Sequence, residues 1–262
     1  MAVIHPSAII DASAELDSSV EVGPYAIVGA GVRLGAGCKV GAHCVIEGPS
    51  TIGANNVFHP FGRIGGPPQD KKYAGEPTTL VIGQGNMFRE CVTLNRGTAQ
   101  DRGETTIGDG NWIMAYVHVA HDCVVGDDVI MANTTNLAGH VHVGDHVVLG
   151  GYTGVHQFCK IGAHAMTAVG TVVLQDIPPF VMASGDAAKA HGINSEGLRR
   201  RGFGAERIAA IKRAYKLLYK RGLTLDQARE ELAAAVADGG PGAEDCALLV
   251  TFLGSVTRGI VR

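Results

Sequence analysis

The chain has 262 residues and a formal net charge of −3, a balance that argues against a nucleic-acid-binding protein. Hydrophobic residues make up 46% of the sequence and aromatic residues only 5%, while the 37 glycines are about twice the usual share. This composition is untypical of an ordinary globular core. It favours a repetitive backbone with many tight corners.

The N-terminus reads MAVIHPSAIID, without the basic region and apolar run of a signal peptide. No stretch approaches the roughly 18 apolar residues that a membrane helix needs. The six cysteines form no CxxC pair and no paired spacing. We therefore expect a cytoplasmic protein in a reducing compartment, without stable membrane insertion.

From the start of the chain, an aliphatic or aromatic residue recurs at every sixth position: Ile4, Ile10, Leu16, Val22, Val28, Leu34, Val40, Ile46, Ile52, Phe58 and Ile64. The repeat resumes at Ile82 and, after a second break that shifts the register by one residue, runs from Ile107 to Val173. A six-residue period matches neither a helix nor an alternating strand. It is typical of short strands joined by corners and stacked as a solenoid.

A small or β-branched residue follows each of these aliphatic residues by four positions, and four cysteines occupy that slot: Cys38, Cys44, Cys123 and Cys159. Because a buried free cysteine behaves as a small hydrophobic residue, we interpret them as core filler. Two segments leave the repeat, QDKKYAGEPTT (69–79) and TAQDRGET (98–105), and are predicted to be projecting loops. Such loops are where binding residues concentrate.

After the double proline at 178–179 the repeat stops, and we expect the rest of the chain to be helical. An apolar stripe at helical spacing contains Ile208, Ile211, Tyr215 and Leu218. Thr224 and Gln227 form a capping-box pattern before a second helix, and a last helix is predicted over about 244–256. The predicted fold is mainly β, a solenoid over 1–190 with a loop projecting at about 69–80, followed by a C-terminal α-helical domain over 191–262.

Five motifs are much more specific than the repeat: QDKKYAGEPT (69–78), HVAHDC (118–123), NLAGHVHVGD (136–145), GVHQFCKIGAH (154–164) and INSEGLRRRGF (193–203). With them the chain resembles the hexapeptide-repeat acyltransferases, and among these the UDP-N-acetylglucosamine O-acyltransferases of lipid A biosynthesis. The resemblance implies a left-handed parallel β-helix in which three hexads close one turn and stack on the next, at a strand spacing of about 4.8 Å. It also implies a homotrimer with active sites in grooves between subunits.

The activity that the resemblance implies is transfer of an (R)-3-hydroxyacyl chain from acyl carrier protein to the 3-hydroxyl of UDP-N-acetylglucosamine, the first step of lipid A biosynthesis. The acyl donor is carried on the phosphopantetheine of the carrier protein, so no further cofactor is expected. With three hexads to a turn, His121 lies beside Gly139 and Gly139 beside Gln157, Asp122 beside His140, Ala138 beside His156, and His118 beside Asn136.

This patch favours His121 as a general base, because an imidazole can take a proton from an attacking sugar hydroxyl. The backbone N–H of Gly139 is placed to donate to the developing oxyanion, and the resemblance implies the same roles, with Asp122 orienting His121. Direct attack on the thioester needs no acyl-enzyme. Asp122 is equally compatible with an ordinary corner residue. Four further residues fit substrate contacts better than proton transfer: His118, His140, His156 and Gln157.

A metal site is the main alternative for these histidines, because γ-class carbonic anhydrases share this fold and bind zinc between subunits. In that family two ligands from one strand are five positions apart, whereas position 126 is glycine here. We therefore predict no metal. Six histidines outside the patch are assigned to surface or capping roles: His5, His43, His59, His142, His146 and His164.

The resemblance assigns binding of the nucleotide sugar to Gln69, Asp70, Lys72, His156, Asn194, Glu196, Arg200 and Arg201. Basic and amide side chains suit a pyrophosphate, uridine and sugar hydroxyls, although the arginine run by itself is equally typical of a solvated surface. Residues 196 to 221 include nine Lys or Arg but only two Glu, and this excess of positive charge favours docking of the acidic carrier protein on this helical face. Val169 occupies a position where the long-chain members of the family have glycine. Because its branched side chain would shorten the groove for the lipid tail, we predict a shorter 3-hydroxyacyl chain.

Three other functions remain open from the residues. A coenzyme A-dependent hexapeptide acetyltransferase would share the repeat. The lipid A N-acyltransferase carries an extra N-terminal uridine-binding domain, whereas the repeat begins at Ile4 here. A non-catalytic β-helix scaffold would explain the repeat, but not the clustered histidines.

Overall fold

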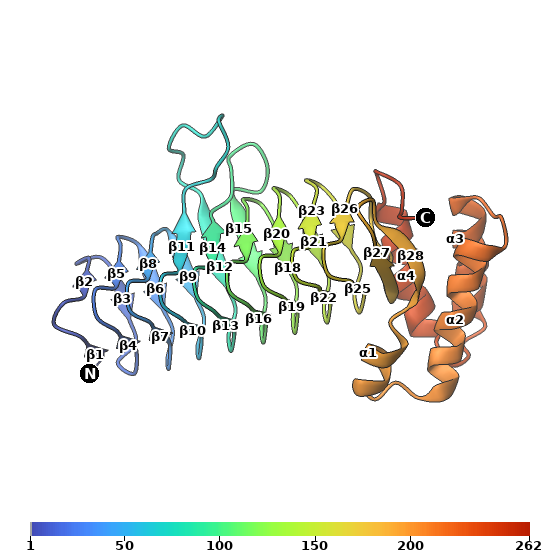
Figure 1. Ribbon diagram of the computed structural model, residues 1–262, viewed down its shortest axis with the longest axis horizontal. Helices are drawn as coiled ribbons and strands as arrows, with labels where there is room; N and C mark the ends of the chain where they lie inside the picture. Colours follow the sequence, from blue (N-terminus) through green and yellow to red (C-terminus); the bar gives the residue numbers. More distant parts are fainter. Residues whose placement is uncertain (1) are drawn as a thin grey trace.

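The computed structural model describes residues 2–262 and shows an elongated stack of short strands with helices at its C-terminal end (Figure 1). Each strand from β1 to β23 pairs with the strand three further along the chain, so three sheets run the length of the stack.

The first sheet contains β1 (Val3–Ile4), β4 (Glu21–Val22), β7 (Lys39–Val40), β10 (Val57–Phe58), β13 (Met87–Phe88), β16 (Trp112–Ile113), β19 (Ile130–Met131), β22 (Val148–Leu149), β25 (Met166–Thr167), β27 (Val181–Ser184) and β28 (Lys189–Ile193). The second contains β2 (Ile9–Ile10), β5 (Ile27–Val28), β8 (Val45–Ile46), β11 (Arg63–Gly66), β14 (Thr93–Asn95), β17 (His118–Val119), β20 (Asn136–Leu137), β23 (Gly154–Val155) and β26 (Val172–Val173). The third contains β3 (Glu15–Leu16), β6 (Val32–Leu34), β9 (Ser50–Ile52), β12 (Thr79–Ile82), β15 (Glu104–Ile107), β18 (Val124–Val125), β21 (His142–Val143) and β24 (Lys160–Ile161).

The register of the parallel strands follows the hexads. Leu137 pairs with Val119 on one side and Val155 on the other, so one turn of the solenoid comprises three hexads. These aliphatic residues point inward and are 0–3% exposed, because a two-residue strand can bury only one of its two side chains in the narrow interior. The four cysteines assigned to the core are fully buried, and burial raises the pKa of the Cys123 thiol to about 12, so these assignments are confirmed.

Two turns are longer than three hexads, and each carries a projecting loop. In the first of them Arg63 pairs with Thr93, and in the second Thr93 pairs with His118. The extra residues form the loops 67–78 and 96–103, which leave the solenoid side by side along one edge (Figure 1). The second loop was predicted to reach residue 105, but β15 already begins at Glu104.

The expectation of a wholly helical tail after the prolines is wrong for residues 181–193. There β27 and β28 form an antiparallel hairpin that extends the first sheet. The helices follow as α1 (Ser195–Arg200), α2 (Ala205–Lys220), α3 (Leu225–Ala237) and α4 (Ala243–Ser255). The predicted capping box is present at α3, where the Thr224 and Gln227 side chains each bond to the other's backbone N–H. The division into domains at residue 190 stays a prediction, because β28 runs across it.

The two ends of the solenoid differ. In the first turn, Val3, Ile4 and Ile9 are 69%, 42% and 62% exposed. The other end is covered by the hairpin and by a second hydrophobic core, which joins Phe180 to α1, α2, α3 and α4. In the part of the chain that the structure describes, no helix has the length and apolar composition required to cross a bilayer.

Candidate active site

The predicted patch lies where the second sheet turns into the third. Asp122, His140 and Phe158 are the corner residues of three successive turns, and each has a left-handed backbone with φ of 59–65°. The Phe158 ring stacks on the His140 ring at 4.4 Å between centroids, and the His140 ring meets the His121 ring edge to face at 5.0 Å. The stacking predicted from three hexads to a turn therefore brings these residues together.

His121 and Asp122 form a buried hydrogen-bonded pair. Nδ1 of His121 lies 2.8 Å from Oδ2 of Asp122, and the carboxylate is fully buried while the imidazole side chain is 13% exposed. A carboxylate at Nδ1 selects the tautomer that carries its proton there, which leaves Nε2 as an acceptor. Among the described residues, Nε2 has no hydrogen-bond partner.

Asp122 is itself held by three hydrogen bonds with two threonines that precede it, two that its carboxylate accepts and one that its backbone N–H donates. Thr98 donates its backbone N–H to Oδ1 at 2.9 Å and its hydroxyl to Oδ2 at 2.6 Å. The backbone N–H of Asp122 donates to Oγ1 of Thr105 at 2.8 Å. A buried carboxylate with this many donors is fixed in position, which is more than an ordinary corner residue requires.

Gly139 leaves room for the His121 ring. A Cβ atom at Gly139 would lie 2.5 Å from Cε1 and 2.7 Å from Nε2 of His121, closer than atoms can approach. At the equivalent position on another edge of the solenoid, the backbone N–H of Asp109 and of Asp127 each donates to an aspartate of the next turn. Within residues 2–262, the Gly139 N–H donates no hydrogen bond, so it is free to meet a ligand beside His121.

His118 is the first residue of β17, just before the corner that holds His121 and Asp122. Its Nδ1 is 2.8 Å from Oγ1 of Thr93 on the preceding turn, and its register partner on the next turn is Asn136, as predicted. Burial and the neighbouring His121 lower the pKa of His118, so its ring is neutral at pH 7. A neutral ring held by a threonine fits a hydrogen-bonding contact with a ligand.

The second projecting loop contributes residues that the sequence did not single out. Oδ2 of Asp101 lies 2.6 Å from Nδ1 of His140, and Thr98 binds Asp122 as described. Periodicity could not find them, because both lie in the extra residues of an over-long turn. A weak signal was present, since a loop that leaves a rigid scaffold beside histidines is a place to look for their partners.

A groove of about 490 Å³ opens beside this corner. It joins the first projecting loop, through Asp70 and Lys72, to His140. His142 and Lys160 line it as well, so His142, which was assigned a surface or capping role outside the patch, is an exposed residue of the adjoining groove. His142 is the register partner of Lys160, and burial together with that cation lowers its pKa. Gln69 is exposed next to Asp70 on the same loop.

A second, largely apolar groove of about 380 Å³ crosses the outer face of the second sheet. His118 and His156 line it, and Val172 and Leu174 bound it on the last turn. Gln157 is exposed at the adjacent corner. Val169 does not line this groove in the single chain. It is 74% exposed at the corner before β26, stacked over Gly151.

The remaining predicted binding residues lie at a different corner, where the third sheet turns into the first. Asn194 is 4% exposed and its side chain is occupied, since it accepts from the Gly197 N–H as the α1 cap and donates to the carbonyl of His164. Glu196 pairs with Arg199 and Arg200. Nη1 of Arg201 is buried, with no hydrogen-bond partner among the described residues. One chain therefore does not bring these residues to His121.

Several basic side chains lie together at this corner. Burial, together with the neighbouring His146, Arg201 and Arg207, lowers the pKa of His164 to about 4. Burial also lowers the pKa of the Arg201 guanidinium. The unpartnered guanidinium therefore fits an anionic group that approaches from outside the chain.

His121, Asp122 and His140 are close enough to hold a metal ion. However, Nδ1 of His121 and Nδ1 of His140 already face carboxylates at 2.8 and 2.6 Å. This geometry is that of histidines oriented by acids, a pattern as suited to proton transfer as to ligation. The absence of a metal therefore stays a prediction.

Comparison with known proteins extends these observations to the whole chain. The family model described as UDP N-acetylglucosamine O-acyltransferase, domain 2, matches residues 176–261, and that of the bacterial transferase hexapeptide matches residues 104–139. The chain is 57% identical over 218 residues to an acyl-[acyl-carrier-protein]--UDP-N-acetylglucosamine O-acyltransferase of Verminephrobacter eiseniae, covering 83% of each chain.

Solved structures agree along the full length. LpxA from Acinetobacter baumannii matches with a TM-score of 0.95 and 47% identity, covering 99% of this chain and 100% of that chain. A UDP-N-acetylglucosamine acyltransferase from Francisella novicida matches with a TM-score of 0.96 and 38% identity, covering 99% and 94%.

The stacked hexads and these matches define a hexapeptide-repeat acyltransferase, and they confirm the predicted left-handed parallel β-helix with C-terminal helices. More narrowly, the chain belongs to the family of the UDP-N-acetylglucosamine O-acyltransferases, the acyltransferases of lipid A biosynthesis.

Proposed function

We propose that this protein transfers an (R)-3-hydroxyacyl chain from acyl carrier protein to the 3-hydroxyl of UDP-N-acetylglucosamine. The observation that carries the proposal is the His121–Asp122 pair, which directs a free Nε2 over Gly139. The family's name supports the two substrates. A coenzyme A-dependent acetyltransferase has no comparable support, because the solenoid and the helical tail both match the carrier-dependent family.

In the reaction, Nε2 of His121 takes the proton of the sugar 3-hydroxyl as its oxygen attacks the thioester carbonyl. The Gly139 N–H donates to the oxyanion of the tetrahedral intermediate. Collapse of the intermediate breaks the C–S bond, and the phosphopantetheine thiolate takes the proton back from the imidazolium. Asp122 holds the ring and stabilises its charged form. No covalent enzyme intermediate, metal or further cofactor is needed, because the proton returns to the leaving group.

The acceptor would lie in the groove between the first projecting loop and the corner, with Gln69, Asp70 and Lys72 on one side. His140, His156 and Gln157 would contact it from the solenoid. The other binding residues, Asn194, Glu196, Arg200 and Arg201, lie at another corner of the chain, as described. A homotrimer that places that corner against the groove of its neighbour would complete the site, which is why we propose trimeric assembly. Of these residues, Arg201 has the strongest physical case and Asn194 the weakest.

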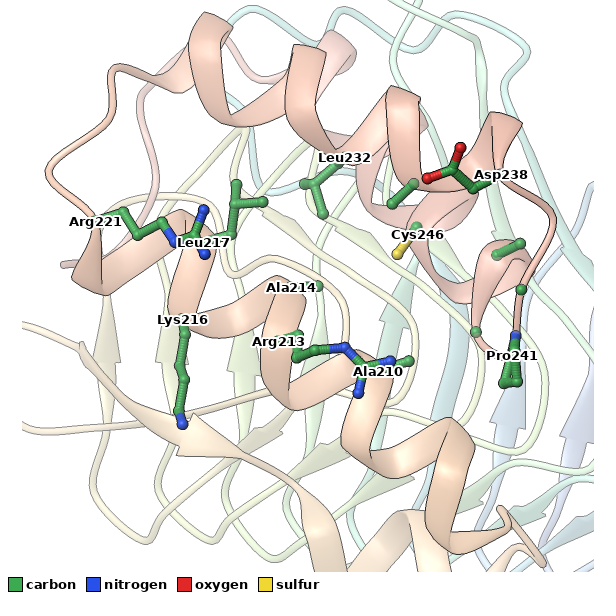
Figure 2. Close-up of a pocket in the computed structure, with 14 residues that line it drawn as sticks. Ala210, Arg213, Ala214, Lys216, Leu217, Arg221, Leu232, Asp238, Pro241 and Cys246 are labelled. Carbon is green, nitrogen blue, oxygen red and sulfur yellow. The ribbon is translucent and has the colours of Figure 1, made fainter.

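The carrier protein would dock on α2. Of the nine basic residues counted between 196 and 221, Arg199, Arg200, Arg207 and Arg221 form ion pairs with acidic residues of the chain. Lys212, Arg213, Lys216 and Lys220 are exposed and form no ion pair in residues 2–262. Arg213 and Lys216 rim an apolar pocket of about 440 Å³ between α2, α3 and α4 (Figure 2). Such a surface suits an acidic partner helix with apolar residues.

Charge reversal on α2 is expected to weaken carrier docking and leave chemistry intact. We expect Arg213→Glu with Lys216→Glu to raise KM for the acyl carrier protein by about tenfold or more at low salt, while KM for UDP-N-acetylglucosamine is unchanged. Steady-state kinetics at two ionic strengths measures the effect. Arg33→Glu, a reversal far along the solenoid, is the control. Equal KM values for the double variant and this control would contradict the docking surface.

The donor is tested with purified protein, UDP-N-acetylglucosamine and a ladder of 3-hydroxyacyl carrier proteins, with acetyl-CoA as the rival donor. We expect product only with the carrier-bound donors, and a preference for shorter chains that Val169→Gly shifts towards longer ones. Turnover with acetyl-CoA alone would refute the proposed function. An unchanged chain preference in Val169→Gly would refute only the role of Val169.

A further inference from the structure

The loop 96–103 reaches two histidines of the candidate site. It bonds to Asp122, the partner of His121, and it supplies Asp101, the partner of His140. Thr98 bonds to both carboxylate oxygens of Asp122, and Asp101 bonds to His140. The two contacts come from one short segment, although Asp122 and His140 belong to successive turns of the solenoid. The loop therefore spans the corner at which the proposed chemistry takes place.

The hydroxyl of Thr98 has a specific target. It donates to Oδ2 of Asp122 at 2.6 Å, the same oxygen that lies 2.8 Å from Nδ1 of His121. Thr98 is 1% exposed and Asp122 is fully buried, so no water competes for these bonds. With the backbone N–H of Thr98 on Oδ1, the carboxylate cannot rotate. The ring that it orients is thereby fixed as well.

Asp101 acts on His140 in a parallel way. Its Oδ2 lies 2.6 Å from Nδ1 of His140, whose ring is held from the other side by stacking on Phe158. The acid selects the tautomer with the proton on Nδ1 and turns Nε2 away from itself. Asp101 and His140 both line the groove assigned to the acceptor, together with Thr98.

The start of the same segment anchors the first projecting loop. Nδ2 of Asn95 donates to the carbonyl of Pro67 at 2.9 Å. The Arg96 guanidinium donates to the carbonyls of Gly48 and Gly65 and to the hydroxyl of Tyr73 at 3.3 Å. Residues 95–101 thus tie the acceptor loop, the proposed base and His140 to one rigid scaffold.

We propose that Thr98 and Asp101 are positioning residues, Thr98 for the general base His121 and Asp101 for the substrate contact His140. The inference rests on the proposed function. The two roles predict different kinetic signatures. Loss of the Thr98 hydroxyl loosens the base and lowers kcat, whereas loss of the Asp101 carboxylate loosens a binding contact and raises KM for the acceptor.

The test compares Thr98→Val, Thr98→Ser and Asp101→Ala in the full-length protein. Misplacing a catalytic group by a fraction of an ångström is costly, so we expect Thr98→Val to lower kcat by about 10- to 100-fold, with KM for UDP-N-acetylglucosamine within about twofold of the parent value. Thr98→Ser keeps the hydroxyl and should restore most of kcat. Asp101→Ala should raise that KM about tenfold or more, with a smaller change in kcat.

Thr153→Val is the matched control, because Thr153 is also fully buried and, among residues 2–262, its hydroxyl bonds to Gly150, Thr167 and Ala168, away from His121 and Asp122. Equal kcat for Thr98→Val and Thr153→Val would overturn the role of Thr98. Should Thr98→Val fail to fold, Thr98→Ser against Thr98→Ala at a temperature where both are folded decides the same point. Absence of product from the parent protein with UDP-N-acetylglucosamine and 3-hydroxyacyl carrier protein would instead refute the proposed function itself.

Discussion

Replacing His121 with alanine is expected to lower kcat by at least about 100-fold, because general base catalysis contributes 10²- to 10⁴-fold. The side chain is 13% exposed and is bonded to the buried Asp122 carboxylate, so its loss removes buried surface and one partner of that carboxylate. We therefore expect a lower thermal midpoint in a variant that still folds and keeps its oligomeric state. KM for UDP-N-acetylglucosamine should change much less than kcat. Steady-state kinetics with the carrier-bound donor measures both constants.

His59→Ala is the matched control, because Nδ1 of His59 also faces a carboxylate, Glu90, at 3.4 Å, but on another part of the solenoid. This control should retain the parental kcat. A His121→Ala protein as active as His59→Ala would rule out His121 as the base and would turn attention to His140, which is also oriented by an acid.

Gly139→Ala is expected to be nearly as damaging as loss of the histidine. The new Cβ would lie 2.5 Å from Cε1 of His121, so the ring must rotate away from its position over the backbone N–H. Because a displacement of about 1 Å can cost 100-fold in rate, we expect kcat to fall by about that factor. Because rotation of the ring breaks its hydrogen bond to the buried Asp122, the free energy of unfolding should fall by a typical overpacking cost of about 1–3 kcal/mol.

Gly62→Ala provides the control for a glycine of the same solenoid, since its Cβ would meet its nearest atoms at 3.7 Å. The combination of Gly139→Ala with His121→Ala separates the two roles of Gly139. If the clash with the ring is the whole effect, the double variant should be no slower than His121→Ala alone. If Gly139→Ala alone leaves kcat unchanged, the close packing of His121 on Gly139 is not needed for turnover.

The core of the site was predictable because the solenoid is periodic. Once three hexads make a turn, the sequence positions of His121 and Gly139 determine that they are neighbours, and the structure agrees. The same arithmetic fails in the loops. Thr98 and Asp101 belong to the over-long turn between Thr93 and His118, and nothing in a period of six says where the extra residues fold back.

The tail shows a limit of another kind, because a shared motif does not say how each of its side chains is used. The assignment of Asn194 to the acceptor rests on such a motif and stays a prediction, while in the single chain its side chain caps α1 and is buried. A motif shows which residue type occupies a position, but it does not distinguish a packing role of that side chain from a binding role. The hairpin β27–β28 was missed because its strands follow a double proline and carry none of the hexad spacing.

The unequal ends of the solenoid have a consequence for how the molecule opens. Within residues 2–262, the strands of each turn pair with those of the neighbouring turns, so local unfolding should begin at the exposed first turn and proceed inward one turn at a time. The helices and hairpin close the opposite end. His121 follows β17, and five strands of the second sheet, from β2 to β14, precede β17 in the stack. Amide protons should therefore exchange fastest near Val3 and progressively more slowly towards His121, so the reacting residues are shielded by the first turns of the solenoid, which precede both projecting loops.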